Sequence, residues 1–485
     1  MSAELERLAA ACVLPGFPGP VAPDWLRRRL AEGLGGVVLF AWNVASREQL
    51  AALTAALRAE NENVLIAIDE EGGDVTRLET EHGSSYPGNA ALGAVDDVDL
   101  TERVAAAIGA ELGAVGINVD LAPVADVNTN PLNPVIGVRS FGADGDLVAR
   151  HVTAFVQGLQ RTGVAACAKH FPGHGDTAED SHHELPVVAT LEEAALLPFR
   201  AAVEAGVRCV MTAHIVVRSL GDEPATMSPR VLRELLRDEL GFDGLVMTDA
   251  LEMRAISATV GVEEGAVRAL AAGADAIGLG HDLFDEATGS VIAAIADAVR
   301  AGRLAESRLV EAAGRVREAS HPSRAAAPEE TVDSSIGREA ARRAVVVEGT
   351  ADLAAGPLVV ELAPEPGMAA GALPEGPGDW FAEVVPGTDV VRVHDGDVGD
   401  ALRARDGRQV VVIARDAYRH AWQRDALVAL LAAAEKAVVV EVGLPHWRPV
   451  AATSYVATYG AGRVNVQAAA ERLYSEIATR GGAVR

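Results

Sequence analysis

Ionisable side chains are concentrated in one 18-residue stretch, 169–186, which reads KHFPGHGDTAEDSHHELP and holds four of the chain's 12 histidines. Two kinds of chemistry fit this composition. His170, His174, His182 and an aspartate could bind a metal ion, although the HExxH spacing of zinc proteases is absent. Alternatively, imidazole groups titrate near neutral pH and can both give and take protons. The segment therefore predicts a metal site or an acid–base site.

The pair Asp180 and His182 favours the acid–base interpretation. Side chains two residues apart in an extended segment point to the same side. The carboxylate can then hold the proton of one ring nitrogen and aim the other nitrogen at a substrate. A solvated surface pair without a catalytic role is the alternative.

Asp249 is a candidate partner for this pair, because it ends an apolar run in GLVMTDALEM. A carboxylate in that place could attack an electrophilic carbon and form a covalent ester. It could equally cap a helix over ALEMRAIS, which is a common use of aspartate. Spacing alone does not decide between the two roles.

The elements that must position these groups follow an alternating pattern. Short apolar runs, which read as buried strands, alternate with stretches that repeat apolar residues at helical spacing. Eight strands that alternate with helices predict an α/β fold of the (β/α)₈ TIM-like barrel type, with a doubly wound open sheet as the alternative. The runs are 12–17, 35–40, 64–69, 117–123, 164–170, 208–214, 244–250 and 274–280.

Five of these apolar runs carry polar or charged residues at their carboxyl ends. In a barrel, the carboxyl ends of the strands converge on one face. These polar or charged residues are Asp69, Asp120, Lys169, His170, His214 and Asp249. Active sites of such barrels lie on that face, so the clustering favours function over a simple return of polarity at strand ends.

The chain is predicted to contain two domains. Residues 1–325 would form the barrel, 326–341 a linker rich in Pro, Ser and charge, and 342–485 a smaller layered α/β domain with a mostly parallel sheet. Six apolar runs support the second domain: 343–349, 358–364, 389–393, 408–416, 437–443 and 455–461.

Composition limits the partners. With 42 Lys and Arg against 69 Asp and Glu, the formal charge of −27 argues against a nucleic-acid partner and gives no attraction to an anionic membrane. The three cysteines are scattered, the N-terminus lacks a signal-peptide pattern, and no apolar run is long enough to cross a bilayer. We therefore expect a cytoplasmic protein without disulfides, with its oligomeric state left open.

Four segments together resemble the NagZ-type β-N-acetylglucosaminidases of glycoside hydrolase family 3. The stretch 169–186 resembles their K-H-F-P-G-H-G-D-T signature, which is followed after three residues by S-H. DEEGGDVTRL (69–78), NPVIGVRSFG (133–142) and GFDGLVMTDALEM (241–253) resemble three further segments, in the same order. The resemblance covers about 250 residues, and the second domain matches more loosely.

The resemblance implies a retaining, two-step mechanism without cofactor or metal. Asp249 would be the nucleophile, and His182, oriented by Asp180, would be the acid–base group. Five residues would bind the carbohydrate substrate: Asp69, Arg139, Lys169, His170 and His214. Two departures are Glu70, where the family often has glutamine, and a second histidine, His183, beside the expected acid.

The leading hypothesis is release of N-acetylglucosamine from the non-reducing end of peptidoglycan fragments or related glycosides. Three alternatives stay open. Phosphate could replace water, since a histidine repels that anion less than a carboxylate does. The 2-acetamido preference cannot be derived from the sequence, so a broader β-glycosidase is possible. A non-catalytic sugar-binding protein would belong to another functional class.

Overall fold

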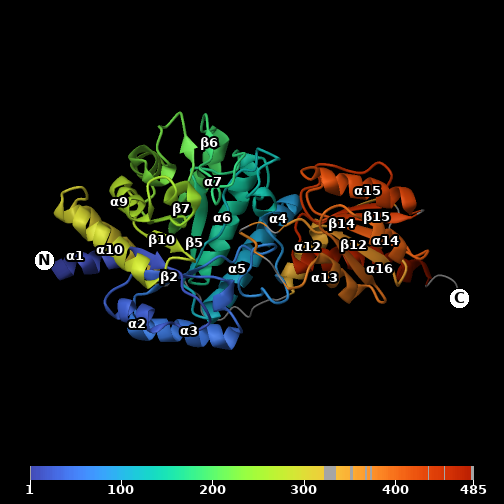
Figure 1. Cartoon of the computed structure of the whole chain (residues 1–485), viewed down its shortest axis with the longest axis horizontal. Coiled ribbons are helices and arrows are strands. Elements are labelled where there is room, and N and C mark those ends of the chain that lie inside the picture. Colours follow the sequence, from blue (N-terminus) through green and yellow to red (C-terminus); the bar gives the residue numbers. More distant parts are fainter. Residues whose placement is uncertain are drawn as a thin grey trace. The chain divides into compact units, whose positions relative to one another are not determined.

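The computed structural model describes residues 2–321, 335–349, 353–365, 367, 369–371, 374–434, 436–452 and 454–481. They form two compact units (Figure 1). The first comprises Met1–Glu71, Thr101–Ile136 and Gly142–Val332, and the second comprises Gly72–Leu100, Gly137–Phe141 and Asp333–Arg485. The second unit thus takes in two segments from within the range predicted as barrel. Residues 326–334 of the expected linker lie outside the described residues, and helix α12 (Ile336–Ala344) begins inside its remainder.

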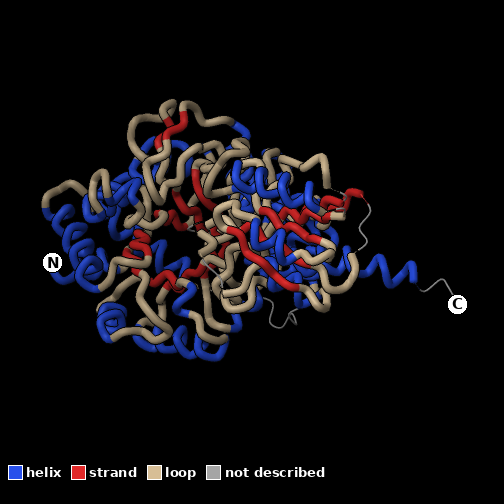
Figure 2. The backbone as a smooth tube through the Cα atoms, turned by 45° about the vertical axis from the view of Figure 1, so that its right-hand side comes forward, coloured by secondary structure: helices blue, strands red, loops and turns tan. Residues whose placement is uncertain are grey.

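The first unit is built on eight parallel strands, each of which overlaps one of the predicted runs. Six pair in the order β2-β3-β4-β5-β7-β9, and β1 pairs with β10. A parallel bridge between Met247 and Ala276 joins β9 to the start of β10. Next to it, β1 lies beside β2, and the backbone N–H of Gly35 donates to the carbonyl oxygen of Ala10. Figure 2 shows the strands curving around a common centre, so the TIM-like barrel is confirmed. The strands are β1 (Val13–Pro15), β2 (Gly36–Leu39), β3 (Leu65–Ile68), β4 (Val119–Asp120), β5 (Ala165–Phe171), β7 (Cys209–Thr212), β9 (Leu245–Thr248) and β10 (Ile277–Gly280).

Helices surround this barrel, because each strand is followed by a segment whose apolar residues recur at helical spacing. They are α1 (Ser2–Ala10), α2 (Asp24–Ala31), α3 (Arg47–Glu60), α6 (Gly145–Arg161), α7 (Glu193–Glu204), η4 (Arg230–Glu239), α9 (Val262–Ala272), α10 (Asp285–Arg300) and α11 (Glu306–Ser320). Helix α5 (Val98–Ala114) begins in the second unit and ends in the first. In the described part of the chain, each helix is too short or too polar to cross a bilayer.

Alternate strand residues fill the barrel interior. Small side chains such as Ala67, Ala165 and Cys167 leave room for larger ones, as the inward layers of a closed barrel require. Val316 and Ala319 of α11 join this cluster from the amino ends of the strands. All three cysteines are buried and free.

A buried charge cluster stabilises the amino end of β10. Asp275 is fully buried and contacts the guanidinium groups of Arg237 (2.7 Å), Arg308 (2.5 Å) and Arg315 (3.4 Å). We expect Asp275→Ala to lower the free energy of unfolding by about 3–5 kcal/mol, because it leaves three arginines without their shared partner. Urea unfolding checks this, with the exposed Asp243→Asn as the control; equal midpoints for the two variants would contradict it.

The second unit is an α/β sandwich around a six-stranded sheet of order β11-β16-β15-β14-β12-β13. Only the β11–β16 pair is antiparallel among these strands, so the predicted layered domain is confirmed. The strands are β11 (Val346–Gly349), β12 (Leu358–Leu362), β13 (Asp389–Val393), β14 (Val410–Ala414), β15 (Ala437–Glu441) and β16 (Ser454–Ala457).

Helices cover both faces of this sheet (Figure 1). Alternate strand residues face each layer. Val360 and Val412 pack with α14 (Gly399–Ala404) and α15 (Ala421–Ala433). On the other face, Val359 and Val411 pack with α13 (Pro377–Val384) and α16 (Arg463–Gly481). The two buried faces explain why these strands read as continuous apolar runs.

Candidate active site

Asp249 lies directly after β9, at the carboxyl end of the barrel. Its Oδ1 accepts a hydrogen bond from the backbone N–H of Ala250 (2.8 Å). Burial opposes ionisation, but the nearby histidines, His170 foremost, lower the pKa of Asp249 below its ordinary value. The next helix, α8 (Arg254–Ser257), has Met253 as its N-cap, so Asp249 does not cap it. The group is an ionised carboxylate free to act as a nucleophile.

His182 and Asp180 form the expected pair. The Nδ1 of His182 lies 2.6 Å from Oδ1 of Asp180, which also accepts the backbone N–H of His182 at 2.9 Å. Partial burial opposes ionisation of Asp180, but its hydrogen bonds to His182 and the charge of that ring lower its pKa to about 2. A permanent carboxylate therefore holds the Nδ1 proton and leaves Nε2 for a substrate. The exposed neighbour His183 contacts Asp180 through the backbone, where its N–H donates to the Asp180 carbonyl oxygen at 2.9 Å.

Lys169 of β5 is buried between two carboxylates. Its Nζ lies 2.6 Å from Asp69 Oδ1 and 2.7 Å from Glu71 Oε1. Asp69 is the more exposed of the two, with 20% of its side chain accessible against 3% for Glu71. The lysine is thus a buried ion-pair partner, and it holds Asp69 in place at the open face of the barrel.

His170 is oriented by Asp126, a residue that the sequence analysis did not select. Oδ2 of Asp126 lies 2.7 Å from Nδ1 of His170, and Oδ1 accepts the backbone N–H of His174 at 2.6 Å. Asp126 is fully buried, which opposes ionisation, but the charge of His170 and its hydrogen bond lower the pKa of Asp126. The carboxylate fixes which His170 nitrogen faces the site.

We expect Asp126→Asn to lower kcat/KM by about 10²-fold on the aryl β-N-acetylglucosaminide that the sequence resemblance implies as a substrate, because an amide no longer fixes the proton of His170 on Nδ1. The loss of a charged acceptor for buried N–H groups should also lower stability by about 1–3 kcal/mol. Steady-state kinetics and thermal unfolding measure both effects. The control is Asp176→Asn, an exposed carboxylate of the same loop. A kcat/KM within twofold of wild type for Asp126→Asn would contradict the role.

His214 follows β7 and is fully buried. Its Nε2 lies 3.1 Å from the carbonyl oxygen of Ala250, which can only accept, so Nε2 carries the proton. Its Nδ1 lies 2.8 Å from the hydroxyl of Thr226. Burial lowers the pKa of His214, so the ring is neutral and fixes the backbone beside Asp249.

The remaining loop histidine has a structural role. His174 is buried, with Nδ1 bonded to Thr177 (2.7 Å) and Nε2 to Ser181 (3.0 Å), beside His182. Burial lowers its pKa to about 4. A side chain on Gly175 would meet the carbonyl of Val127, so glycine allows the loop to pack there. Among the described residues, the three side chains whose potential metal ligands lie close together are Glu252, His281 and Asp282, which are outside this loop.

Comparison with known proteins agrees with this geometry. Residues 24–319, which contain each of these side chains, match the family described as "Glycosyl hydrolase family 3 N terminal domain". The chain belongs to glycosyl hydrolase family 3. The recognition drawn from its motifs is confirmed, and the protein is a glycoside hydrolase.

Curated and solved relatives of this family 3 glycoside hydrolase carry related names. This chain is 38% identical to beta-hexosaminidase A of Pseudoalteromonas piscicida. The match covers 58% of this chain and 52% of that protein. The chain is also 38% identical to the beta-hexosaminidase of Bordetella avium, covering 54% of this chain and 80% of the relative. A family 3 beta-N-acetylglucosaminidase structure from Paenibacillus sp. str. FPU-7 matches 97% of both chains, at 34% identity and a TM-score of 0.86.

In this family 3 enzyme, the structure brings together most of the site residues that were predicted from the sequence. Asp69, Lys169 and His170, together with Asp180, His182, His214 and Asp249, lie at the carboxyl ends of the barrel strands or on the loop after β5. Arg139 belongs to the second unit, in η2 (Gly137–Arg139), where its carbonyl accepts from Asn89. Its expected role in substrate binding stays a proposal.

Asp120 is a further buried acid at the end of β4. One oxygen accepts the backbone N–H of Glu70 (3.0 Å), while Oδ2 is without a hydrogen-bond partner. Full burial raises its pKa well above the ordinary value. The bond from the Glu70 N–H ties the loop that carries Asp69 to β4.

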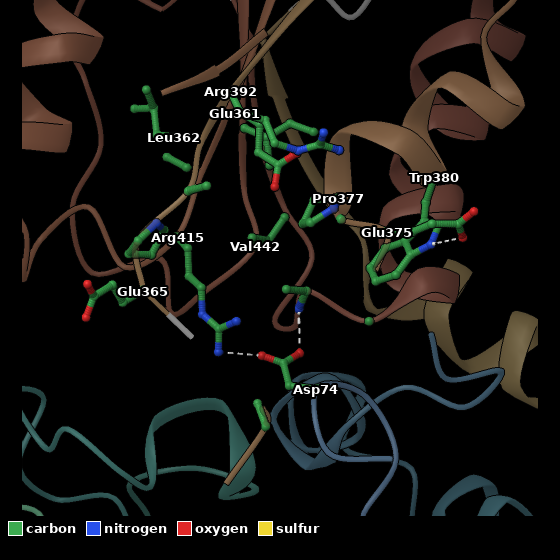
Figure 3. A pocket seen from close by; sticks show the side chains of 18 of the residues that line it. Asp74, Glu361, Leu362, Glu365, Glu375, Pro377, Trp380, Arg392, Arg415 and Val442 are labelled. Atoms are coloured by element: carbon green, nitrogen blue, oxygen red, sulfur yellow. Dashed lines mark hydrogen bonds and ion pairs between the residues drawn. The ribbon is translucent and has the colours of Figure 1, made fainter. Parts of the chain in front are cut away.

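The second unit of the enzyme contains a cavity of about 380 Å³ at the carboxyl ends of β12 and β14 (Figure 3). Arg415 and Asp74 point toward one another across it, with a nitrogen-to-oxygen distance of 2.6 Å. Asp74 also accepts the backbone N–H of Ala461 at 2.7 Å. Glu361 faces the same cavity, and burial raises its pKa. The two contacts of Asp74 explain why the segment after Glu71 packs with this sheet.

Proposed function

We propose that the protein is a retaining exo-β-N-acetylglucosaminidase. The observation that carries the proposal is the pairing of an ionised carboxylate, Asp249, with a histidine whose Nδ1 is held 2.6 Å from a second carboxylate. These are the two groups that a double displacement at an anomeric carbon requires: one to attack and one to move a proton. The relatives named beta-hexosaminidase and beta-N-acetylglucosaminidase support the choice of sugar.

In the first step, an oxygen of Asp249 attacks the anomeric carbon while the glycosidic carbon–oxygen bond breaks. The leaving oxygen takes its proton from Nε2 of His182, and a glycosyl ester forms on Asp249. In the second step, water loses a proton to the same nitrogen and attacks the anomeric carbon, which releases Asp249. Two inversions retain the β configuration of the sugar.

A histidine changes the electrostatics of this reaction relative to a two-carboxylate site. Two nearby carboxylates oppose each other's ionisation, which raises the pKa of one of them. Here the proton carrier is neutral or positive, so it helps to keep Asp249 ionised, as the direction of the Asp249 pKa shift requires. Asp180 in turn stabilises the imidazolium that forms when water is activated.

Sugar binding is assigned to the groups around this pair. Asp69, held by Lys169, would accept hydrogen bonds from the hydroxyls of the terminal sugar, and Nε2 of His170 would accept one from a sugar hydroxyl, since its Nδ1 proton is held by Asp126. His214 would shape the floor of the pocket, and Arg139 would add a cationic contact. We propose peptidoglycan fragments or related glycosides as the source of the terminal N-acetylglucosamine, and a cytoplasmic site of action.

The test is release of p-nitrophenol from its β-N-acetylglucosaminide, with and without phosphate, followed by NMR of the first sugar product. Phosphate-independent release of the β-anomer of N-acetylglucosamine is the expected result. Formation of N-acetylglucosamine 1-phosphate would establish a phosphorylase instead. The p-nitrophenyl β-glucoside is compared under the same conditions, and faster release from it would indicate a broader β-glycosidase. Absence of release from either substrate would favour a sugar-binding protein.

A further inference from the structure

Trp42 is a large aromatic residue left open to solvent. It lies in η1 (Ala41–Asn43), directly beyond β2, and 45% of the residue is exposed. Its indole N–H is nevertheless turned inward and donates to the carbonyl of Phe17 at 2.9 Å. The exposed part is therefore the apolar ring, held in one orientation.

Two neighbouring rings support Trp42. The Phe40 ring lies 5.5 Å away at a tilt of 34°, and the His281 ring lies 5.3 Å away at 85°. A side chain on Gly16 would stand 2.9 Å from the Phe40 ring and 3.2 Å from the Cα of His281, so glycine at this position lets the two residues meet. The arrangement is a rigid aromatic cluster, defined here as Phe40, Trp42 and His281.

This aromatic cluster lies at the same end of the barrel as the candidate active site. Leu39 of β2 pairs with Ile68 of β3, so Trp42 and Asp69 both extend from the carboxyl ends of adjacent strands. The cluster is also connected to the segment after β9, where Glu252 follows Asp249 by three residues. Its two oxygens accept the backbone N–H groups of His281 (2.7 Å) and Asp282 (2.8 Å). The cluster is thereby linked to the loop that carries Asp249.

We propose that Trp42 is the platform on which the leaving-group sugar of the substrate stacks. The inference rests on the proposed glycosidase function and adds the residue that binds the aglycone. The C–H face of a pyranose ring is apolar and can cover an exposed indole, while its hydroxyls stay at the wet edge. Because the indole N–H is already bonded to Phe17, the contact is by ring face and not by a hydrogen bond from Trp42.

The charge beside the platform selects a neutral aglycone over an anionic one. Asp282 Oδ1 lies 2.7 Å from His281 Nδ1, and Glu252 Oε1 lies 3.6 Å from His281 Nε2. Even a protonated His281 leaves these three side chains with a net charge of −1. Of the two substrate sources proposed above, a related glycoside whose aglycone is a second N-acetylglucosamine unit therefore suits the surface better than a peptidoglycan fragment whose aglycone sugar carries a free carboxylate.

The first experiment compares Trp42→Ala and Trp42→Phe on two substrates: the β-1,4-linked dimer of N-acetylglucosamine, and β-N-acetylglucosaminyl fluoride, whose leaving group cannot stack. Trp42→Ala should lower the ratio of kcat/KM for the dimer to that for the fluoride about 10-fold. Trp42→Phe should restore most of the ratio. Val310→Ala, an exposed apolar truncation on α11, is the matched control.

The outcomes separate this inference from the proposed function. Wild-type protein that cleaves neither substrate refutes the glycosidase proposal. Wild-type turnover with an unchanged ratio in Trp42→Ala overturns the platform alone. A second measurement uses Asp282→Asn, which should raise kcat/KM for a dimer with a lactyl carboxylate relative to the neutral dimer roughly threefold at low salt. No change in that preference would overturn the charge selection.

Discussion

Replacing Asp249 by asparagine is expected to lower kcat on p-nitrophenyl β-N-acetylglucosaminide by at least about 10⁴-fold, because a neutral amide is a poor nucleophile toward the anomeric carbon. The fold should survive the change. The Oδ1 of asparagine can still accept the N–H of Ala250, which is the backbone contact of the native carboxylate, and α8 does not depend on Asp249 for its cap. We therefore expect thermal unfolding within about 0.5 kcal/mol of wild type.

A smaller residue at the same position gives a sharper test of the role. Asp249→Gly leaves space on the α face of the sugar, and added azide should enter there and yield the α-glycosyl azide from an activated aryl substrate. The same reagent added to His182→Ala should attack the glycosyl ester from the opposite face and yield the β-azide. Asp249→Asn with more than about 1% of wild-type kcat, or a β-azide from Asp249→Gly, would refute Asp249 as nucleophile.

The strands of both units could be predicted from the sequence because each is a short apolar run buried on both sides. Every predicted run from 12–17 to 455–461 overlaps an observed strand. The ends of helices are harder to predict from the sequence. ALEMRAIS has helical spacing, yet α8 begins only at Arg254, because residues 250–253 form a turn beneath the site with Ala250 bonded to His214 and Leu251 to Gly278.

The site was predictable where one segment carries both partners and less so where the partners come from different strands. Asp180 and His182 are two residues apart, and their pairing could be derived from spacing alone. Asp126 lies 44 residues before His170, on the segment after β4, so only the parallel pairing of β4 with β5 brings them together. A signal was present, since VAD at 124–126 directly follows the apolar run 117–123 that contains Asp120.

Glu71 shows a second limit of sequence reasoning. In DEEGG, Glu70 is the departure from the family pattern, but Glu71 is the side chain that pairs with Lys169. Both glutamates are almost completely buried, and alternation alone cannot tell which of two adjacent acids faces the lysine beyond a strand end. Lys169 was assigned to sugar binding with a buried ion pair as the alternative, and the structure shows the ion pair.

The second large effect is expected for the acid–base pair, and it should depend on the leaving group. His182→Ala should lower kcat/KM about 10²–10⁴-fold for the N-acetylglucosamine dimer, whose leaving oxygen needs a proton. A dinitrophenyl glycoside needs no protonation on departure, so its bond-breaking step should lose far less. His183→Ala is the matched control, because this exposed neighbour should change neither substrate by more than about twofold. Equal losses for His182→Ala on both substrates would contradict the acid role.

The pH profile then tests Asp180 as the orienting carboxylate. Its pKa of about 2 lies below the ordinary value, so the charge and its contribution to stability are fully present above pH 4 and are lost as the pH falls toward 2. Protonation of Asp180 therefore cannot cause a loss of activity between pH 4 and 8. Asp180→Asn removes the charge that favours the imidazolium, so the basic limb of kcat/KM should move to lower pH by about 1 unit. An unchanged basic limb would mean that another group supplies the proton, and His182 would then serve the loop and not the reaction.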